Sequence, residues 1–223
     1  MSLPSPDTML ARLLVLLFGF TWHELAHATA AWLLGDPTPK EEGCLTLNPA
    51  RHIDPIGALM LLVTGFGWSQ TTCLNPARMT RVRSPRVAMA IVAAAGPLAN
   101  FVLAIAGLIV LHFEAAITAR LVAWGLSPAL IAKGWQLFVL TIFIEIVLAF
   151  FNLIPIPPLD GATILKGISP PPIAAFIESL EPYGALIFIA FFFVMPYLGL
   201  DVAGWMIGTA TRRFLLLAAQ LGL

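Results

Sequence analysis

The feature that most constrains this sequence is a cluster of ionisable residues inside an apolar run. The run extends from about Met9 to Leu34 and contains His23, Glu24 and His27 in the pattern His-Glu-x-x-His. On a helix, residues four apart lie on one face, one turn from each other. Two histidines placed in this way can bind one zinc ion, and the glutamate between them can act as a general base toward water.

The hydrophobic setting gives weight to a motif that any five residues can match by chance. Inserting a strongly polar group at membrane depth costs about 2.5–3.5 kcal/mol on insertion scales, so ionisable residues there usually mark functional sites. The alternative is that His23 and His27 are packing residues and that Glu24 bonds to a neighbouring helix. The insertion cost favours the functional interpretation over this alternative.

The composition is that of a polytopic membrane protein. Of the 223 residues, 59% are hydrophobic and only 11% are charged, and the mean hydropathy is +0.91. Soluble domains contain about 25% charged residues. The formal net charge is zero, so nothing suggests a nucleic-acid partner. Cys44 and Cys73 match no metal-binding spacing, and we interpret both as reduced thiols because the topology below places them near the cytosol.

Four apolar segments are long enough to cross a membrane, which takes about 20 helical residues. They cover about residues 9–34, 87–113, 135–153 and 183–200. The run from Ile53 to Trp68 is apolar, but it is short and contains proline and glycines, so we expect a re-entrant or buried core segment rather than a crossing. We expect the tail, residues 203–222, to form an interfacial helix, with a fifth crossing as the alternative.

The remaining segments are interpreted as connections. Residues 114–134 are expected to be a mixed loop, residues 170–172 a proline linker, and residues 69–76 an extended edge. The predicted fold class is therefore an all-α polytopic membrane protein with about four transmembrane helices, a re-entrant or short hairpin region and a C-terminal interfacial helix. We expect one membrane-embedded domain over residues 1–223, with its core in 9–165 and peripheral helices in 166–223.

The distribution of lysine and arginine predicts the orientation. A basic cluster precedes the second apolar segment and consists of Arg78, Arg81, Arg83 and Arg86. With this cluster in the cytosol, seven of the twelve basic residues are cytosolic and four lie outside. His23 and His27 then lie in the cytosolic half of the first segment. A cleaved signal peptide is a competing interpretation, but no positive charge precedes Arg12 and cleavage would remove the motif.

A catalytic zinc ion usually has three protein ligands and one water. The other ionisable candidates at membrane depth are His52, Asp54, Glu145 and Asp160. Asp160 follows a proline-rich turn at the cytosolic end of the third segment, and such a turn can direct a carboxylate back toward the first. Alternatively, Asp160 caps the helix after it, and the residues alone leave both roles open. His52 and Asp54 are interpreted as loop-ordering residues.

Several motifs, in this order along the chain, resemble the site-2 protease family of intramembrane zinc metalloproteases. They are His23-Glu24-Leu25-Ala26-His27, Ala95-Gly96-Pro97-Leu98-Ala99-Asn100 and Asn152-Leu153-Ile154-Pro155-Ile156-Pro157-Pro158-Leu159-Asp160-Gly161. The stretch from Leu47 to Gly57 is similar to the compact prokaryotic branch of that family. The resemblance covers nearly the whole chain and is strongest over about residues 10–165.

The resemblance implies an intramembrane zinc endopeptidase that cleaves transmembrane segments of membrane-protein substrates. It implies that His23, His27 and Asp160 bind one zinc ion, that Glu24 is the catalytic base, and that Asn152 positions the substrate or stabilises the oxyanion. For Asn152, the alternative is a helix C-terminal cap. The expected location is the cell membrane, as a multi-pass protein in the lipid bilayer with its active site toward the cytosol. The rival function is a non-catalytic scaffold or metal transporter derived from the same fold.

Two positions depart from the pattern of the family. After the Gly67-Trp68 pair the family often has Ala-Lys-Pro, whereas this chain has Ser69-Gln70-Thr71. The family commonly has an asparagine seven residues before Asn152, and here that residue is Glu145. Seven residues make two helical turns, so Glu145 shares a face with Asn152. We expect Glu145 to be protonated or bonded to a polar group such as Asn100, in a structural role, with substrate gating as the alternative.

Overall fold

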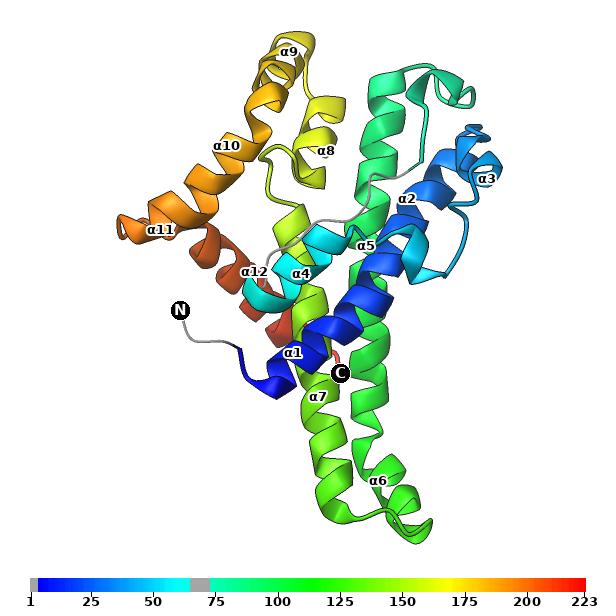
Figure 1. The fold of residues 1–223 in the computed structure, drawn as a ribbon, viewed down its shortest axis with the longest axis vertical. Helices are drawn as coiled ribbons and strands as arrows, with labels where there is room; N and C mark the ends of the chain where they lie inside the picture. The colour runs from blue at the N-terminus through cyan, green and yellow to red at the C-terminus, as the bar shows by residue number, and fades with distance from the viewer. Residues whose placement is uncertain (1–3, 65–72) are drawn as a thin grey trace.

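The computed structural model describes residues 4–64 and 73–223, and the elements formed by these residues are helices (Figure 1). Within these described residues, four helical runs are long and apolar enough to cross a membrane: Pro6–Leu33, Pro85–His112, Pro128–Asn152 and Pro171–Tyr197. Many large apolar side chains on these runs are exposed, as expected where lipid is the solvent. The predicted all-α polytopic class with four crossings is confirmed.

The first run is divided by a segment of π-helix. α1 (Pro6–Leu14) continues through the π-helical η1 (Val15–Phe20) into α2 (Thr21–Leu33), which contains the histidine motif. Short π-helical insertions occur frequently at functional sites. The run ends at Gly35, whose φ of 102° lies in the left-handed region that glycine adopts without steric cost.

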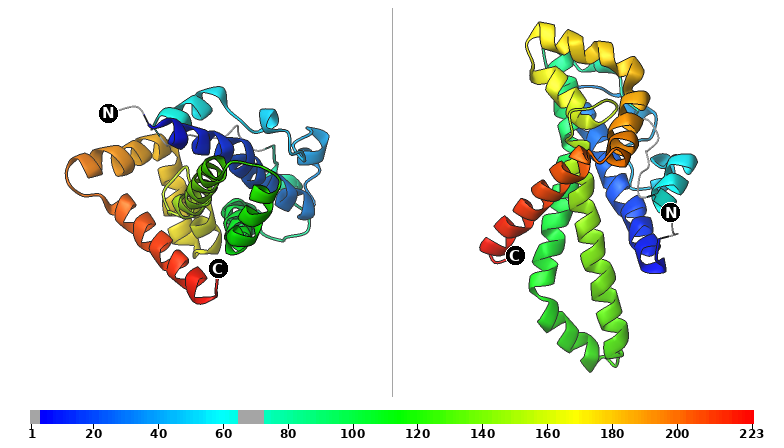
Figure 2. Two further views of the ribbon diagram at one scale, coloured as in Figure 1. Left: turned by 90° about the horizontal axis from the view of Figure 1, so that it is seen from below. Right: turned by 90° about the vertical axis from the view of Figure 1, so that its left-hand side faces the viewer.

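α5 (Pro85–His112) is the central helix. It packs against α2, against α7 (Pro128–Asn152) and against α8 (Asp160–Ile168). Away from α8, α5 and α7 extend side by side to one end of the molecule, where α6 (Glu114–Ala123) connects them (Figure 2). α5 therefore contacts both α2, which contains the two histidines, and α8, which begins at Asp160.

The segment predicted as a loop, residues 114–134, is mostly helical, so that prediction is wrong. It contains α6, and α7 begins at Pro128, seven residues before the predicted start. The Ser127 side chain accepts a hydrogen bond from the Leu130 N–H, and Pro128 occupies the first helical turn. A serine cap followed by proline is a helix-start signal, and it outweighs the mixed composition of the segment.

The short apolar segment forms α4 (Pro55–Thr64), whose ten residues are too few to cross a bilayer as a helix. The Asp54 carboxylate accepts hydrogen bonds from backbone N–H groups of the first turn of α4. Leu61 packs against the apolar side chains of η1, and Arg12 Nη1 donates to Leu62 O at 2.9 Å near the end of α4. α4 is thus a short helix attached to the first run and not a crossing, and its re-entrant placement stays a prediction.

The C-terminal third is a chain of helices that begins at the prolines. α9 (Pro171–Leu180) starts within residues 170–172, so the prediction of a linker there is wrong; proline is favoured in the first turn of a helix. α10 (Gly184–Ile189), η5 (Ala190–Val194) and α11 (Met195–Tyr197) complete the fourth run. α12 (Val202–Gln220) packs on α5 and α7. It is not one of the four candidate crossings, and its interfacial placement stays a prediction.

A set of polar contacts joins the loop after α2 to the loop before α5, and we call this set the loop clamp. Asp36 Oδ1 accepts from the Thr38 N–H at 3.0 Å, and Asp36 Oδ2 accepts from the Asn75 N–H at 2.6 Å. The Arg78 guanidinium donates to both carboxylate oxygens of Glu41, at 2.6 and 2.9 Å. α3 (Thr38–Glu41), η2 (Pro49–Arg51) and η3 (Pro76–Arg78) are the short helices of this region.

The loop clamp also contains a disulfide between Cys44 and Cys73. The prediction of reduced thiols is therefore wrong. The two cysteines are 29 residues apart in the sequence and match no motif, and they meet only because the clamp brings the two loops together. Of the predicted extended edge at 69–76, residues 69–72 lie outside the described residues, as does the departure at Ser69-Gln70-Thr71.

Candidate metal centre

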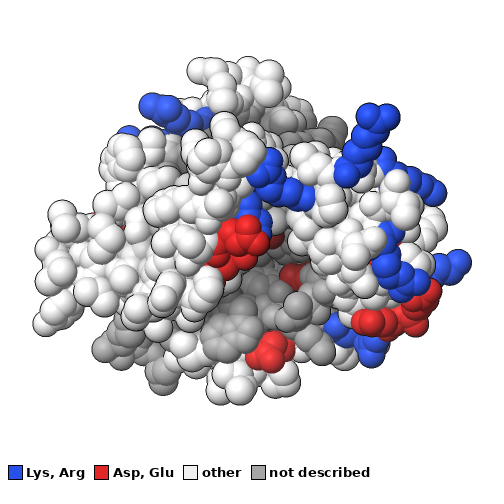
Figure 3. Space-filling view, turned by 90° about the horizontal axis from the view of Figure 1, so that it is seen from above, with Lys and Arg blue, Asp and Glu red and all other residues white. Residues whose placement is uncertain are grey.

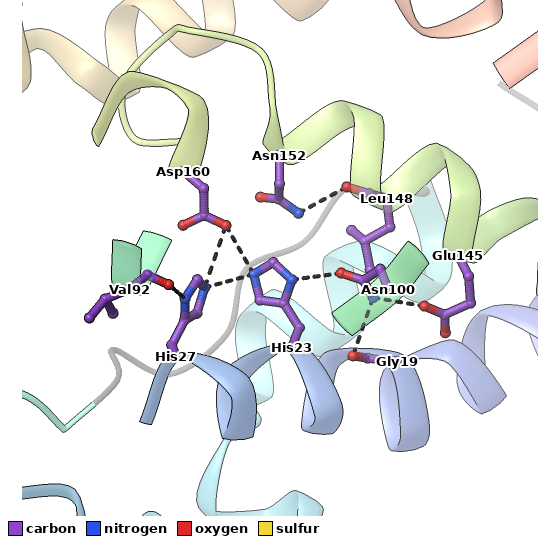
Figure 4. A network of polar contacts seen from close by, with 9 residues as sticks. All are labelled: Gly19, His23, His27, Val92, Asn100, Glu145, Leu148, Asn152 and Asp160. Carbon is purple, nitrogen blue, oxygen red and sulfur yellow. Dashed lines mark hydrogen bonds and ion pairs between the residues drawn. The ribbon is translucent and has the colours of Figure 1, made fainter. Parts of the chain in front are cut away.

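Two histidines of α2 and one aspartate of α8 converge beside α5 (Figure 4). His23 and His27 are one helical turn apart and each is 6% exposed. Asp160 Oδ2 lies 3.2 Å from His23 Nε2 and 3.4 Å from His27 Nε2. The two Nε2 atoms are 3.0 Å apart. Asp160 is the first residue of α8, but the cap position is Leu159 and no side chain caps that end, so the carboxylate is directed to the histidines.

The outer contacts of the two rings define where their protons are. His23 Nδ1 is 2.7 Å from Asn100 Oδ1, and His27 Nδ1 is 2.7 Å from Val92 O. Amide carbonyl oxygens only accept hydrogen bonds, so each Nδ1 carries a hydrogen and each neutral ring presents a lone pair at Nε2. Two lone pairs and a carboxylate oxygen therefore face one another.

No hydrogen-bond donor of the described residues satisfies this group of acceptors. Asp160 Oδ2 is buried and has no hydrogen-bond partner there. Three converging acceptors repel one another unless a cation lies between them, and buried carboxylates are stable only when paired or bound to a metal. Imidazole and carboxylate are ordinary zinc ligands. The chemistry of the set thus fits a divalent cation such as zinc.

The spacing and the free space agree with that fit. Ligand atoms about 2.0–2.1 Å from a tetrahedral zinc ion lie about 3.3–3.4 Å from one another, and the three separations here are 3.0, 3.2 and 3.4 Å. A Cβ atom at Gly96 of α5 would lie 2.5 Å from His27 Nε2 and 2.6 Å from His23 Nε2. Glycine at this position therefore leaves room beside the ligand atoms.

The other two predicted site residues flank the cluster. Glu24 follows His23 on α2 and is 4% exposed. Asn152 is the last residue of α7, and its Nδ2 donates to Leu148 O at 3.1 Å. Figure 4 shows Asn152 at the end of α7, with its amide nitrogen directed toward Leu148 O. The amide has two N–H groups, so one remains for another acceptor.

The remaining ionisable candidates lie apart from the ligand atoms. His52 is 3% exposed, and its Nε2 is 2.8 Å from Thr46 O, so it orders its own loop. Asp54 caps α4. Glu145 Oε2 accepts from Asn100 Nδ2 at 2.7 Å, so the predicted bond between these two side chains is confirmed.

Three residues that contact the ligands, Asn100, Gly96 and Val92, were not predicted as site residues. Asn100 was considered only as a partner for Glu145, although it contacts His23 directly. Gly96 lies in a run of small residues that gives no sign of the ligands beside it. Val92 acts through its backbone carbonyl, which any residue has. The signals present in the sequence were the family-like motif at residues 95–100, which contains Gly96 and Asn100, and the polarity of Asn100 in an apolar run.

Residues 55–195 of the chain, well over half of it, match the model of peptidase family M50. The chain belongs to peptidase family M50. This confirms the resemblance to the site-2 proteases. Asn152 and Asp160 lie within the matched residues, whereas the histidine motif precedes them. The four apolar helical runs and the family together make this M50 peptidase a multi-pass membrane protein.

Individual relatives cover most of this M50 chain. "Putative zinc metalloprotease YwhC" of Bacillus subtilis is 39% identical over 184 residues, which are 80% of this chain and 78% of the relative. "Putative zinc metalloprotease Rip2" of Mycolicibacterium smegmatis is 27% identical over 82% of this chain and 70% of the relative. Rip2 of Mycobacterium tuberculosis is 28% identical over 86% of this chain and 68% of the relative. No solved structure matches significantly.

Proposed function

We propose that this M50 peptidase is a zinc endopeptidase that cleaves membrane-spanning segments of membrane-protein substrates. The observation that supports this most directly is the convergence of His23 Nε2, His27 Nε2 and Asp160 Oδ2, three acceptors without a donor among the described residues. The names of its relatives, which call them putative zinc metalloproteases, support zinc as the metal. The apolar helices around the cluster support a substrate that lies in the bilayer.

Each residue of the cluster has a separate task in this proposal. His23, His27 and Asp160 hold the ion. A bound zinc ion supplies Lewis-acid chemistry, because it lowers the pKa of water and polarises a carbonyl group. Glu24 takes a proton from the attacking water and returns it to the leaving amine. The second N–H of the Asn152 amide donates to the oxygen that becomes negative during the attack.

The location of the site restricts the substrate. The peptide bonds of a helical substrate are hydrogen-bonded and shielded by neighbouring side chains, so a transmembrane helix must unwind locally before it reaches the cluster. The distribution of basic side chains supports a cytosolic position for the end of the molecule that is nearer to the metal-ligand cluster. Figure 3 shows Lys and Arg side chains around the end where α3, α8 and the start of α5 lie. By the positive-inside rule, we assign this end to the cytosol. The Cys44–Cys73 disulfide at the same end is then an exception to the rule that cytosolic thiols stay reduced.

Glu24→Gln tests the proposal. The substitution removes the base and keeps the shape of the side chain, so cleavage of a model membrane substrate in proteoliposomes should fall by about 10²–10⁴-fold. Zinc content, measured by mass spectrometry of the metal, should remain one ion per chain. Glu178→Gln is the matched control, because Glu178 is exposed on α9 and far along the chain from the cluster. Wild-type cleavage by Glu24→Gln would overturn the mechanism.

The rival function of metal transport makes a different prediction. A transporter needs polar residues along a path through more than one crossing. In the described part of the chain, the ionisable residues buried within the candidate crossings are His23, Glu24, His27 and Glu145. His23, His27 and Glu145 belong to the one network of Figure 4, and Glu24 is the neighbour of His23 in the sequence. Proteoliposomes with wild-type protein should therefore show no zinc flux above empty vesicles, and a flux comparable with cleavage rates would favour the transporter.

A further inference from the structure

Glu145 is a buried carboxyl group to which the proposed mechanism gives no task. It lies on α7, is 5% exposed, and belongs to one of the four runs that can cross a membrane. A carboxyl group in such a position is costly and usually functional. Its Oε2 accepts from Asn100 Nδ2 at 2.7 Å, and Asn100 in turn contacts His23 (Figure 4). The two side chains connect α7 to the ligand helix.

Asn100 is completely buried, and both ends of its amide are engaged. Oδ1 lies 2.7 Å from His23 Nδ1, while Nδ2 donates to Glu145 Oε2 and, at 3.4 Å, to Gly19 O. If the amide were reversed, its oxygen would face the acceptor oxygens of Glu145 and Gly19. Its NH₂ would then face His23 Nδ1. Glu145 therefore favours the orientation in which Oδ1 accepts from His23.

The orientation of the amide decides the tautomer of His23. With Oδ1 as the acceptor, Nδ1 carries the hydrogen and Nε2 presents its lone pair to Asp160 Oδ2, 3.2 Å away. A reversed amide would favour the opposite tautomer, in which Nε2 carries a hydrogen and cannot bind a metal. His27 needs no such support, because its Nδ1 faces the backbone carbonyl of Val92.

We propose that Glu145 is a positioning residue that acts through Asn100 to hold His23 in its metal-binding tautomer and orientation. This inference rests on the proposed function, because it assumes that His23 binds zinc. Partners in the outer shell of a metal site commonly orient histidine ligands in this way, and their loss costs about 10–100-fold in metal affinity.

Gly19 of η1 provides the space for the carboxyl group. A Cβ atom at this position would overlap Glu145 Oε1. The π-helical segment therefore presents a backbone without a side chain at the point where the Glu145 carboxyl group contacts the first run. Gly19→Ala displaces the carboxyl group and leaves every polar group of the network in the chain.

Zinc affinity measured by chelator competition on purified protein tests the inference. Glu145→Leu should weaken zinc binding by about 10–100-fold. Glu145→Gln keeps a carbonyl oxygen that can accept from Asn100. Its zinc affinity should therefore stay within about 3-fold of wild type, a smaller loss than that of an outer partner. Val139→Leu is the matched control, because Val139 is an exposed residue of the same helix. Unchanged affinity in Glu145→Leu would overturn the inference.

A double-mutant cycle separates an action through Asn100 from a direct one. Asn100→Leu should lose as much affinity as Glu145→Leu or more, and the double variant should lose no more than Asn100→Leu alone, because the two residues act in series. If the losses multiply, Glu145 acts independently and the inference fails. If Glu145→Leu does not fold, Gly19→Ala replaces it in the cycle.

The tautomer itself is a readout that a purely structural role would not move. Nitrogen-15 chemical shifts of the His23 ring in the metal-free protein should show hydrogen on Nδ1 in wild type and in Glu145→Gln, and a mixture of tautomers in Glu145→Leu. An unchanged tautomer in Glu145→Leu would contradict the inference.

Wild-type protein that binds no zinc would overturn the proposed function as well. Wild-type protein that binds zinc and cleaves, beside a Glu145→Leu variant of equal affinity, would overturn this inference alone.

Discussion

The buried metal-ligand cluster and the loop clamp each bring carboxylates and polar groups together from distant parts of the chain, but they differ in how their acceptors are paired. In the clamp, both oxygens of Asp36 accept backbone N–H groups, and both oxygens of Glu41 face Arg78. In the cluster, His23, His27 and Asp160 present acceptors to one another, and the described residues offer them no donor. The acceptors of the clamp are paired by donors of the protein itself, whereas the acceptors of the cluster need a cation.

Asp160→Asn should have the largest effect, because it gives the cluster a donor and makes it resemble the clamp. The new amide N–H can donate to an Nε2 lone pair of His23 or His27, and an amide is a poorer zinc ligand than a carboxylate. Zinc affinity should fall by more than about 100-fold, beyond the usual effect of an outer partner, and cleavage should be lost. The melting temperature of the metal-free protein should stay the same or rise. An Asn variant with wild-type zinc affinity would remove Asp160 from the ligand set.

Gly96→Ala should also weaken zinc binding, and its effect should be purely steric. Its Cβ atom would lie 2.5 Å from His27 Nε2, closer than van der Waals contact permits. We expect zinc affinity to fall by at least about 10-fold, similar to the loss of an outer partner. Gly134→Ala is the control, because a Cβ atom at this helical glycine meets no atom within 4 Å. Equal zinc affinity in the two alanine variants would show that the space beside Gly96 is not needed.

Asp36→Ala tests the clamp and should act on stability without changing zinc affinity. It leaves the N–H groups of Thr38 and Asn75 without their acceptor, which costs about 1–3 kcal/mol for buried groups.

Thermal unfolding measured against pH provides a second check. Burial opposes ionisation of Asp36, but the hydrogen bonds from Asn75 and Thr38 and the charge of Arg78 outweigh it and lower the pKa of the carboxyl group below its ordinary value of 3.8.

The sign of the pH effect follows from that direction. A group whose pKa is lower in the folded state stabilises the fold above its unfolded pKa. The stability difference between wild type and Asp36→Ala should therefore be constant above about pH 5 and should shrink as the pH falls below 4 toward the lowered folded pKa. A difference that grows on acidification, or a loss of zinc affinity at neutral pH, would contradict a purely structural clamp.

Glu41→Gln should have the smallest effect. The Arg78–Glu41 pair lies at the surface, with side-chain exposures of 40% and 55%, and exposed ion pairs contribute little because water and salt screen them. The melting temperature should fall less than in Asp36→Ala, and the small difference should shrink further at high salt. A decrease as large as that of Asp36→Ala would mean that the ion pair, rather than the buried aspartate, holds the two loops together.

Sequence patterns were informative where the determining contacts are local. His23 and His27 lie one helical turn apart, so their spacing alone predicts a shared face. The four crossings follow from the length of the apolar runs. The errors at residues 114–134 and 170–172 are also local, since the helix-start signals at Ser127 and Pro171 are present in the sequence.

By itself, the sequence determined an all-helical membrane protein with a paired-histidine motif in its first crossing, because both properties depend on neighbours within a few turns. Only the tertiary structure decided between cap and ligand for Asp160, joined Cys44 to Cys73, and placed Asn100 between His23 and Glu145. Asn100 is 77 residues from His23 and 45 from Glu145. Such contacts depend on how the crossings pack, and helical periodicity contains no information about the partner that a buried face will meet.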